Sequence, residues 1–274
     1  MVVTLAEVNA FMGRNHFIFL GISITLIVAT LILLNKFKVP FKKVLFAMFI
    51  VMIISELIKI NEYVVTYTNE EGNVIGAYFN KEGLPFHLCS IQIFFIFLAL
   101  VLKDGSFKEK LIAFMYPTCF IGATFSLLLA TVDIEFSSPL TWQFFMVHAA
   151  LIIFGLYIPM SKVIVIDTKK YVNTCIVLTA LFLVSVYING ITSMPSQNVI
   201  VDGEVVGITE GKYTSFFYSM IPPLEGLPIL NMKYGWFVYA LSIIAIGIIA
   251  LTLAHLPFII KDIKKKRLEK QNNK

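Results

Sequence analysis

The chain has 274 residues, of which 58% are hydrophobic and only 14% are charged, and its mean hydropathy is +0.84. A soluble domain carries nearer to about 25% charged residues, so the composition excludes a soluble globular protein and indicates a polytopic membrane protein. The net charge of +5 lies in short loops and in the tail, which points to membrane topology and not to nucleic-acid binding.

Seven apolar runs are long enough, or nearly so, to cross the hydrocarbon core, which takes about 20 helical residues. They predict an all-α fold of seven transmembrane helices. We expect one membrane domain over residues 1–260 and a basic cytoplasmic tail over 261–274. The third run is the shortest and is expected to begin in the interface. The seven runs lie at 16–34, 44–65, 86–102, 110–130, 141–159, 171–190 and 235–260.

The lysines and arginines predict the orientation. Four segments, 35–43, 103–110, 161–170 and the tail from Lys261, hold 17 of the 22 basic residues. With seven spans all four lie on one side, and cytoplasmic loops are enriched in Lys and Arg. We therefore expect the N-terminus outside and the C-terminus inside.

Two outer loops carry hairpin patterns. The segment 66–84 has a polar turn through Asn69-Glu70-Glu71-Gly72 between β-prone residues, and the segment 191–234 has Asp202-Gly203 between β-branched residues. Asp-Gly in such a setting is a strong short-range hairpin signal. Both loops are predicted to form small β-hairpins.

The stretch Leu84-Pro85-Phe86-His87-Leu88-Cys89-Ser90-Ile91-Gln92 opens the third run. Pro85 suits the first position of a helix, which would place Cys89 about one turn inside the positive helix end. That position favours the thiolate, the nucleophilic form of cysteine. The alternative is that Cys89 is a small buried hydrophobe, as we expect for Cys119 and Cys175. Three cysteines in apolar runs argue against a disulfide framework or a zinc site.

Other polar residues fall within the apolar runs, where each is costly and needs a reason. His148 lies seven residues after Thr141, so roughly 10 Å below the outer boundary, and Cys89 comes to a similar depth. Glu56 and Lys59 are three apart on one helix face and first suggest a structural ion pair, with a role in lining a cavity as the alternative. We expect the candidates to converge in the outer leaflet and to form a substrate site from His87, Gln92, Glu56, Lys59, Gln143 and Asn189.

Leu84-Pro85-Phe86-His87-Leu88-Cys89 resembles the Leu-Pro-Leu-His-Leu-Cys signature of the YwaF-like bacterial integral membrane proteins, a family related to an animal transmembrane acyltransferase of ether phospholipids. Phe145-Met146-Val147-His148 and Gly235-Trp236-Phe237-Val238-Tyr239 add to the resemblance. It implies a seven-helix bundle with Cys89 and His148 as a catalytic pair. Ser90 stands where many relatives have an acidic residue.

The leading hypothesis is therefore a lipid acyl-transfer enzyme, either an acyltransferase or a lipid-ester hydrolase, in a multi-pass protein of the cell membrane. Cys89 would be the nucleophile and His148 the base, with Gln92, Gln143 or helix-start amides stabilising the oxyanion. The partners are membrane phospholipids or other lipids, and no metal or organic cofactor is implied. The alternatives are a solute or lipid binding or transport protein, with Glu56 and Lys59 as a gate, and a structural assembly factor.

Overall fold

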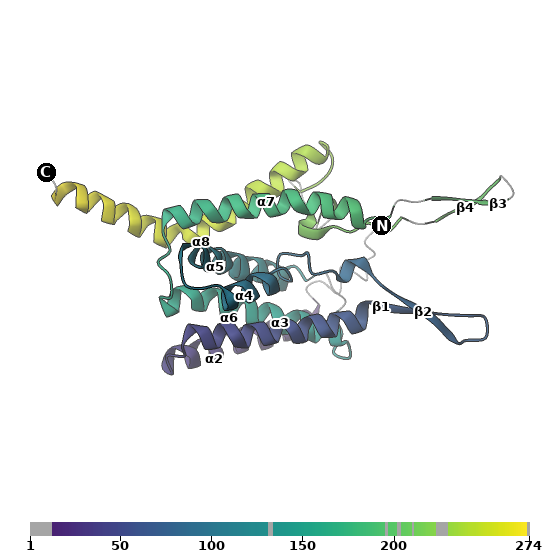
Figure 1. Ribbon diagram of the computed structural model, residues 1–274, viewed down its shortest axis with the longest axis horizontal. Coiled ribbons are helices and arrows are strands. Elements are labelled where there is room, and N and C mark those ends of the chain that lie inside the picture. The colour runs from purple at the N-terminus through teal and green to yellow at the C-terminus, as the bar shows by residue number, and fades with distance from the viewer. Residues whose placement is uncertain are drawn as a thin grey trace.

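A computed structural model describes residues 13–130, 134–194, 197–201, 204–209, 211–222 and 230–272. The helices in these ranges are α2 (Arg14–Lys36), α3 (Phe41–Tyr63), α4 (Gln92–Val101), α5 (Ser106–Leu128), α6 (Pro139–Ser161), α7 (Thr168–Thr192) and α8 (Trp236–Asn272). They lie roughly side by side in a bundle, and the last turns of α8 extend beyond it (Figure 1).

Six of these helices are long and apolar enough to cross a membrane, and they correspond to six of the seven predicted runs. The third run behaves differently: α4 has only 10 residues, about 15 Å of helix, and begins at Gln92. The prediction that its helix starts at Pro85 is therefore wrong. Leu84 is extended, as a residue before proline prefers, and residues 84–91 form turns instead. The seventh span and the orientation stay predictions.

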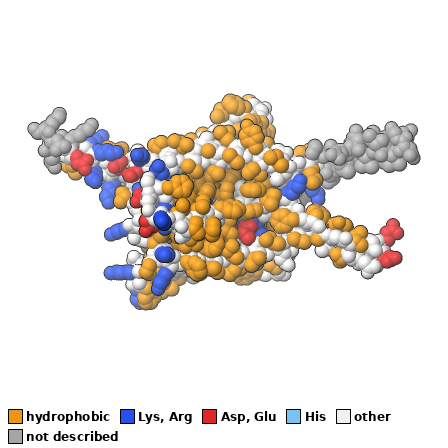
Figure 2. Space-filling model, viewed as in Figure 1, with side chains coloured by type: hydrophobic (Ala, Val, Ile, Leu, Met, Phe, Trp, Pro, Cys, Tyr) orange, Lys and Arg blue, Asp and Glu red, His pale blue; other side chains and the backbone are white. Residues whose placement is uncertain are grey.

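The lysine-rich segments gather at one end of the bundle. Lys170 pairs with Glu109 at 3.0 Å, and Thr168 donates to Asp262 at 2.7 Å, so the starts of α5 and α7 lie beside the last part of α8. Blue side chains cluster at this end in Figure 2, whereas the broad middle of the visible face is hydrophobic. The clustering agrees with the charge pattern from which the orientation was predicted.

The two predicted hairpins form at the other end (Figure 1). Strands β1 (Val64–Thr68) and β2 (Val74–Phe79) pair antiparallel, and so do β3 (Gln197–Val201) and β4 (Glu204–Thr209). Gly72 has φ +84° in the first turn, a conformation that glycine adopts without steric cost. Asp202 and Gly203 lie outside the described residues, but the pairing of Val201 with Glu204 confirms the hairpin around them. The two hairpins form separate sheets.

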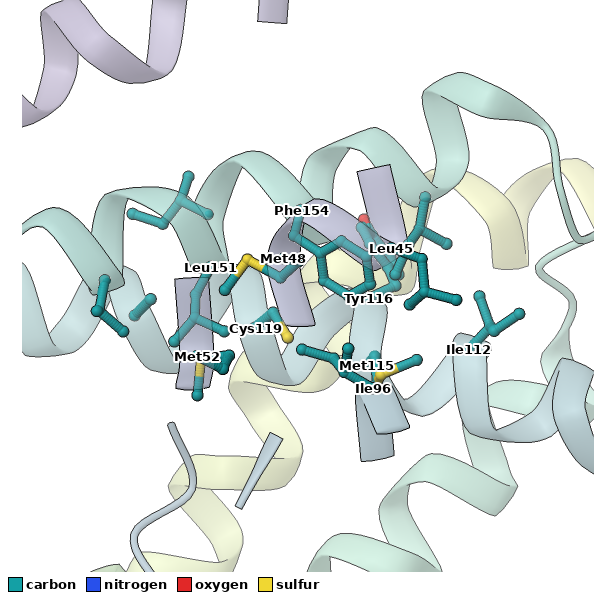
Figure 3. Close-up of a cluster of buried hydrophobic side chains, with 14 of the residues drawn as sticks. Leu45, Met48, Met52, Ile96, Ile112, Met115, Tyr116, Cys119, Leu151 and Phe154 are labelled. Carbon is teal, nitrogen blue, oxygen red and sulfur yellow. The ribbon is translucent and has the colours of Figure 1, made fainter. Parts of the chain in front are cut away.

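The core lies where α3, α4, α5 and α6 meet. Met48, Met52, Cys119, Leu151 and Phe154 are among its buried side chains (Figure 3). At Gly155 a Cβ would stand 2.8 Å from the Phe120 nitrogen and 2.9 Å from the Tyr116 oxygen, so α6 approaches the α5 backbone closely there. Small residues permit such contacts between membrane helices. This central pair of helices provides two of the walls on which the site is built.

Candidate functional site

Residues 84–91, which we call the Cys89 segment, connect the 3-10 turn η1 (Lys81–Gly83) to α4. The Phe86 N–H donates to the Leu84 carbonyl at 2.8 Å, and the Ile91 N–H donates to the His87 carbonyl at 2.8 Å. Cys89 thus precedes α4 and does not lie one turn inside it. The position within a helix from which thiolate stabilisation was predicted is therefore not the one that Cys89 occupies.

The Cys89 segment is attached to α5 along one side. Gln92, fully buried, donates through Nε2 to the Leu88 carbonyl at 3.2 Å and to the Thr118 hydroxyl at 3.1 Å. Leu88 packs over Gly122, where an added Cβ would lie 3.3 Å from it. The Cys89 Sγ lies 3.8 Å from the Ser126 Oγ. The nucleophile candidate is therefore held by several contacts with one helix.

Lys59 attaches the same segment to α3. Its ammonium donates to the Glu56 carboxylate at 3.1 and 3.2 Å and to the Ser90 hydroxyl at 3.1 Å. The two charged side chains are only 12% and 16% exposed. The predicted Glu56–Lys59 pair is confirmed, and its bond to Ser90 links the pair to the residue beside Cys89. A serine at position 90 fits because its oxygen accepts a hydrogen bond from the ammonium without adding a second negative charge.

His148 is buried on α6, and its environment defines its tautomer. Nδ1 lies 2.6 Å from the Phe144 carbonyl oxygen, which can only accept, so Nδ1 carries the proton. In the neutral ring Nε2 then holds a lone pair. No described residue donates a hydrogen bond to Nε2, and the Nε2 atom is not completely enclosed by the protein. His148 thus presents an unprotonated nitrogen, which is the form a general base requires.

Lys59 connects several of the predicted site residues, since it bonds to Glu56 and to Ser90, the residue beside Cys89. Lys59 interacts electrostatically with His87, Cys89 and His148, and His87 also interacts with His148. These side chains arise from α3, the Cys89 segment and α6, so the convergence is tertiary. Within the described part of the chain no hydrogen bond joins Cys89 to His148: Cys89 contacts Ser126, and His148 contacts the Phe144 carbonyl.

The two glutamines differ from the prediction of an oxyanion site. Gln92 uses its amide nitrogen on Leu88 and Thr118, and its Oε1 is buried without a partner in the described residues. A flipped amide would place an oxygen against the Leu88 carbonyl, so the orientation is determined. Gln92 therefore offers an acceptor and cannot stabilise an oxyanion. Gln143 donates to Ser55 at 2.5 Å and holds α6 to α3, with one further N–H.

Asn189, which was also predicted for the substrate site, uses its side-chain amide to hold a neighbouring turn. Its side chain accepts from the Phe216 N–H at 2.9 Å and donates to the Phe216 carbonyl at 3.1 Å and to the Ser219 hydroxyl at 2.8 Å. These bonds hold the turn η2 (Phe216–Tyr218) against α7. The buried Phe216 ring stands edge-on to His87, with centroids 5.1 Å apart. By holding η2, Asn189 also fixes the Phe216 ring that packs against His87.

Sequence reasoning missed Ser126 and Thr118, the α5 hydroxyls that contact Cys89 and Gln92. Both are polar residues within an apolar run, a signal that could have drawn attention to them. The sequence does not tell which way these side chains point, because hydroxyls in membrane helices commonly bond to their own helix, as Thr118 does to the Phe114 carbonyl.

His255 is far from this site. It lies at the lysine-rich end of the bundle, where it is buried, with its Nδ1 2.9 Å from the Leu251 carbonyl oxygen.

A model of the TMEM164 family matches residues 11–254 of the chain. No curated protein and no solved structure matches it. The match supports the resemblance at the level of this family, whereas the narrower YwaF-like bacterial assignment stays a prediction. Six helices that can cross a membrane agree with a multi-pass membrane protein. Because the match spans nearly the whole chain, the protein belongs to the TMEM164 family.

Proposed function

We propose that this protein is a membrane-embedded lipid acyl-transfer enzyme, an acyltransferase or a lipid-ester hydrolase, in which Cys89 is the nucleophile and His148 the general base. The observation that carries the proposal is that the Lys59 ammonium bonds to Ser90, the residue beside Cys89, and acts electrostatically on Cys89 and on His148, whose Nε2 is unprotonated. Polar groups are costly within an apolar bundle and mark functional sites.

The reaction follows from the chemistry of these groups. His148 Nε2 takes the Cys89 proton as the sulfur attacks the ester carbonyl carbon, because a free thiolate is costly in a largely buried site. The carbonyl carbon–oxygen single bond then breaks, and the leaving alcohol receives the proton from His148. The acyl group is now a thioester on Cys89. The hydroxyl of a lysolipid, or water, gives its proton to Nε2 and attacks the thioester, which restores the thiol.

Lys59 supplies positive charge to this sequence. Its ammonium is held by Glu56 and Ser90, so it stays near Cys89 without rearrangement. A fixed cation favours the negative charge that develops on sulfur and then on the carbonyl oxygen. The remaining N–H of Gln143 is a further donor for that oxygen. In this proposal the charge of Lys59, whose own N–H groups are bound to Glu56 and Ser90, and the N–H of Gln143 take over the oxyanion role that Gln92 cannot perform.

Cysteine labelling tests the nucleophile and the base. In detergent, a lipid-soluble maleimide should modify Cys89 before the buried Cys119, with partly exposed Cys175 as an internal reference. His148→Ala should slow labelling of Cys89 relative to Cys175 by about tenfold or more, since a general base typically contributes at least 10²-fold. His255→Ala is the matched control, because His255 also bonds through Nδ1 to a carbonyl four residues earlier.

Lipid turnover tests the function itself. Purified protein incubated with a fluorescent phospholipid and a lysolipid acceptor should transfer or release the acyl chain. Cys89→Ser should abolish this, since a hydroxyl is a much weaker nucleophile than a thiolate. Equal labelling of all three cysteines, unchanged in His148→Ala, would leave Cys89 a packing residue and would favour a binding or transport protein.

A further inference from the structure

Three residues on one face of α5 support the Cys89 segment. Thr118, Gly122 and Ser126 are spaced four apart, so they lie on the same side of the helix. Each meets a different residue of the segment or of the start of α4, and the pairs are Ser126 with Cys89, Gly122 with Leu88 and Thr118 with Gln92. The segment is thus held in one register on α5, with the Cys89 Sγ 3.8 Å from the Ser126 Oγ.

The Ser126 hydroxyl uses its only proton within its own helix. It donates to the Gly122 carbonyl at 3.1 Å, and a carbonyl oxygen can only accept. What Ser126 presents to Cys89 is therefore a lone pair. Thr118 behaves in the same way: its hydroxyl donates to a carbonyl of α5 at 2.7 Å and accepts from the Gln92 amide. The thiol of Cys89 is accordingly the donor in its contact with Ser126.

This contact directs the thiol to α5, whereas the proposed base lies on α6. His148 Nε2 can accept a proton, but no hydrogen bond joins it to Cys89 in the part of the chain that the structure describes. A thiol has a single proton and cannot donate it to two acceptors at once. In this structure the Cys89 proton is held by Ser126 and is not shared with His148.

We propose that Ser126 is a positioning residue: it holds Cys89 as a protonated thiol in a resting orientation, which the side chain must leave before His148 can take the proton. The inference rests on the proposed function, since it takes Cys89 as the nucleophile and His148 as the base. A thiol is a weak hydrogen-bond donor, and rotation about the Cα–Cβ bond is enough to break the contact. The nucleophile is therefore less reactive until its thiol turns away from Ser126.

The infrared S–H stretching band of the full chain in detergent tests the contact itself. This band lies where other protein groups do not absorb, and it moves to lower wavenumber when the S–H donates a hydrogen bond. Subtracting the spectrum of the matched Cys89→Ala chain isolates the band of Cys89, because the other two thiols contribute to both spectra. Ser126→Ala should move the Cys89 band to higher wavenumber, whereas Ser126→Thr, which keeps the hydroxyl, should leave it in place.

Thr124→Ala is the matched control for this measurement. Thr124 also lies on α5 and donates to a carbonyl four residues earlier, that of Phe120, at 2.7 Å. Among the described residues it makes no hydrogen bond to the Cys89 segment. Its replacement should leave the Cys89 band unchanged. An unchanged band in Ser126→Ala, or the same shift in Thr124→Ala, would overturn the proposal.

Maleimide labelling tests whether Ser126 and His148 compete for the thiol. Ser126→Ala should speed labelling of Cys89 relative to Cys175 by about threefold, the factor that corresponds to the roughly 0.6 kcal/mol of a hydrogen bond between membrane helices. The gain should disappear when His148→Ala is also present, because the released thiol then has no base to meet. A gain of the same size in the His148→Ala chain would overturn the proposal, since Ser126 would then act only by loosening the structure.

Failure of the proposed function would be seen in a different comparison. In that case Cys89 labelling would not respond to His148→Ala in the chain that keeps Ser126. The infrared band reports only on the contact between Cys89 and Ser126, and it requires no lipid turnover.

Discussion

The ion pair between Glu56 and Lys59 allows a quantitative test of how the Cys89 segment is held. In Lys59→Met, the Glu56 carboxylate, which is 16% exposed, loses its cation, and Ser90 loses its donor. Breaking a buried pair by removing one partner costs about 3–5 kcal/mol, mostly because a charge is left uncompensated. Since this pair is largely but not completely buried, we expect about 3 kcal/mol for Lys59→Met.

The double variant Glu56→Gln with Lys59→Met removes the uncompensated charge as well. What remains is the lost hydrogen bond from a charged donor to Ser90, about 1.5 kcal/mol. The double variant should therefore be more stable than Lys59→Met alone by about 1–2 kcal/mol, and Glu56→Gln alone completes the cycle that gives the coupling energy.

Reversible unfolding in mixed detergent and dodecyl sulfate micelles gives these free energies. The exposed pair of Lys265 and Glu269 is the control, because at 3.9 Å and 75% and 59% exposure it should show almost no coupling. If Lys59→Met were within about 0.5 kcal/mol of the parent, the pair would not hold the Cys89 segment, and the cationic role of Lys59 would lose its basis.

Three further outcomes are expected. Gly155→Ala should destabilise the bundle by about 1–3 kcal/mol in the same unfolding assay, because the added Cβ would meet the α5 backbone. Gly21→Ala is the control and should be neutral or stabilising, since a Cβ there would have nothing within 4 Å. Equal effects of the two variants would contradict the close α5–α6 contact. Asn189→Ala should release η2 and speed chymotrypsin cleavage after Phe216, and unchanged cleavage would show that the three Asn189 bonds do not hold the turn. A cysteine at Asn73 should react with an impermeant maleimide in intact cells and one at Lys265 should not, while labelling of the tail from outside would refute the predicted orientation.

Hydropathy and charge determined most of the architecture. Apolar runs of about 20 residues have few alternatives to a membrane helix, because every backbone polar group in lipid must be bonded within the segment. Six helices were predictable for this reason, and the two hairpins were predictable from their turn residues. The predicted start of the third helix was wrong, because hydropathy indicates which residues are buried in lipid but not where a helix begins. Most of residues 84–91 are apolar, yet Ser90 bonds to α3, and Gln92, which follows them, bonds to α5, and residues 84–91 remain non-helical.

The site was only partly predictable. Composition singled out Glu56, Lys59, Cys89 and His148, because polar residues in apolar runs are costly and therefore few. The tertiary structure decided how these residues group and which tautomer His148 adopts. It also decided that Gln92 is left with a free acceptor and that Asn189 holds a turn. Each depends on which acceptor or donor a neighbouring helix presents, as the Ser90 hydroxyl does for Lys59. A sequence specifies how many hydrogen bonds a side chain can make, but the packing of other helices decides which of them remain for a substrate.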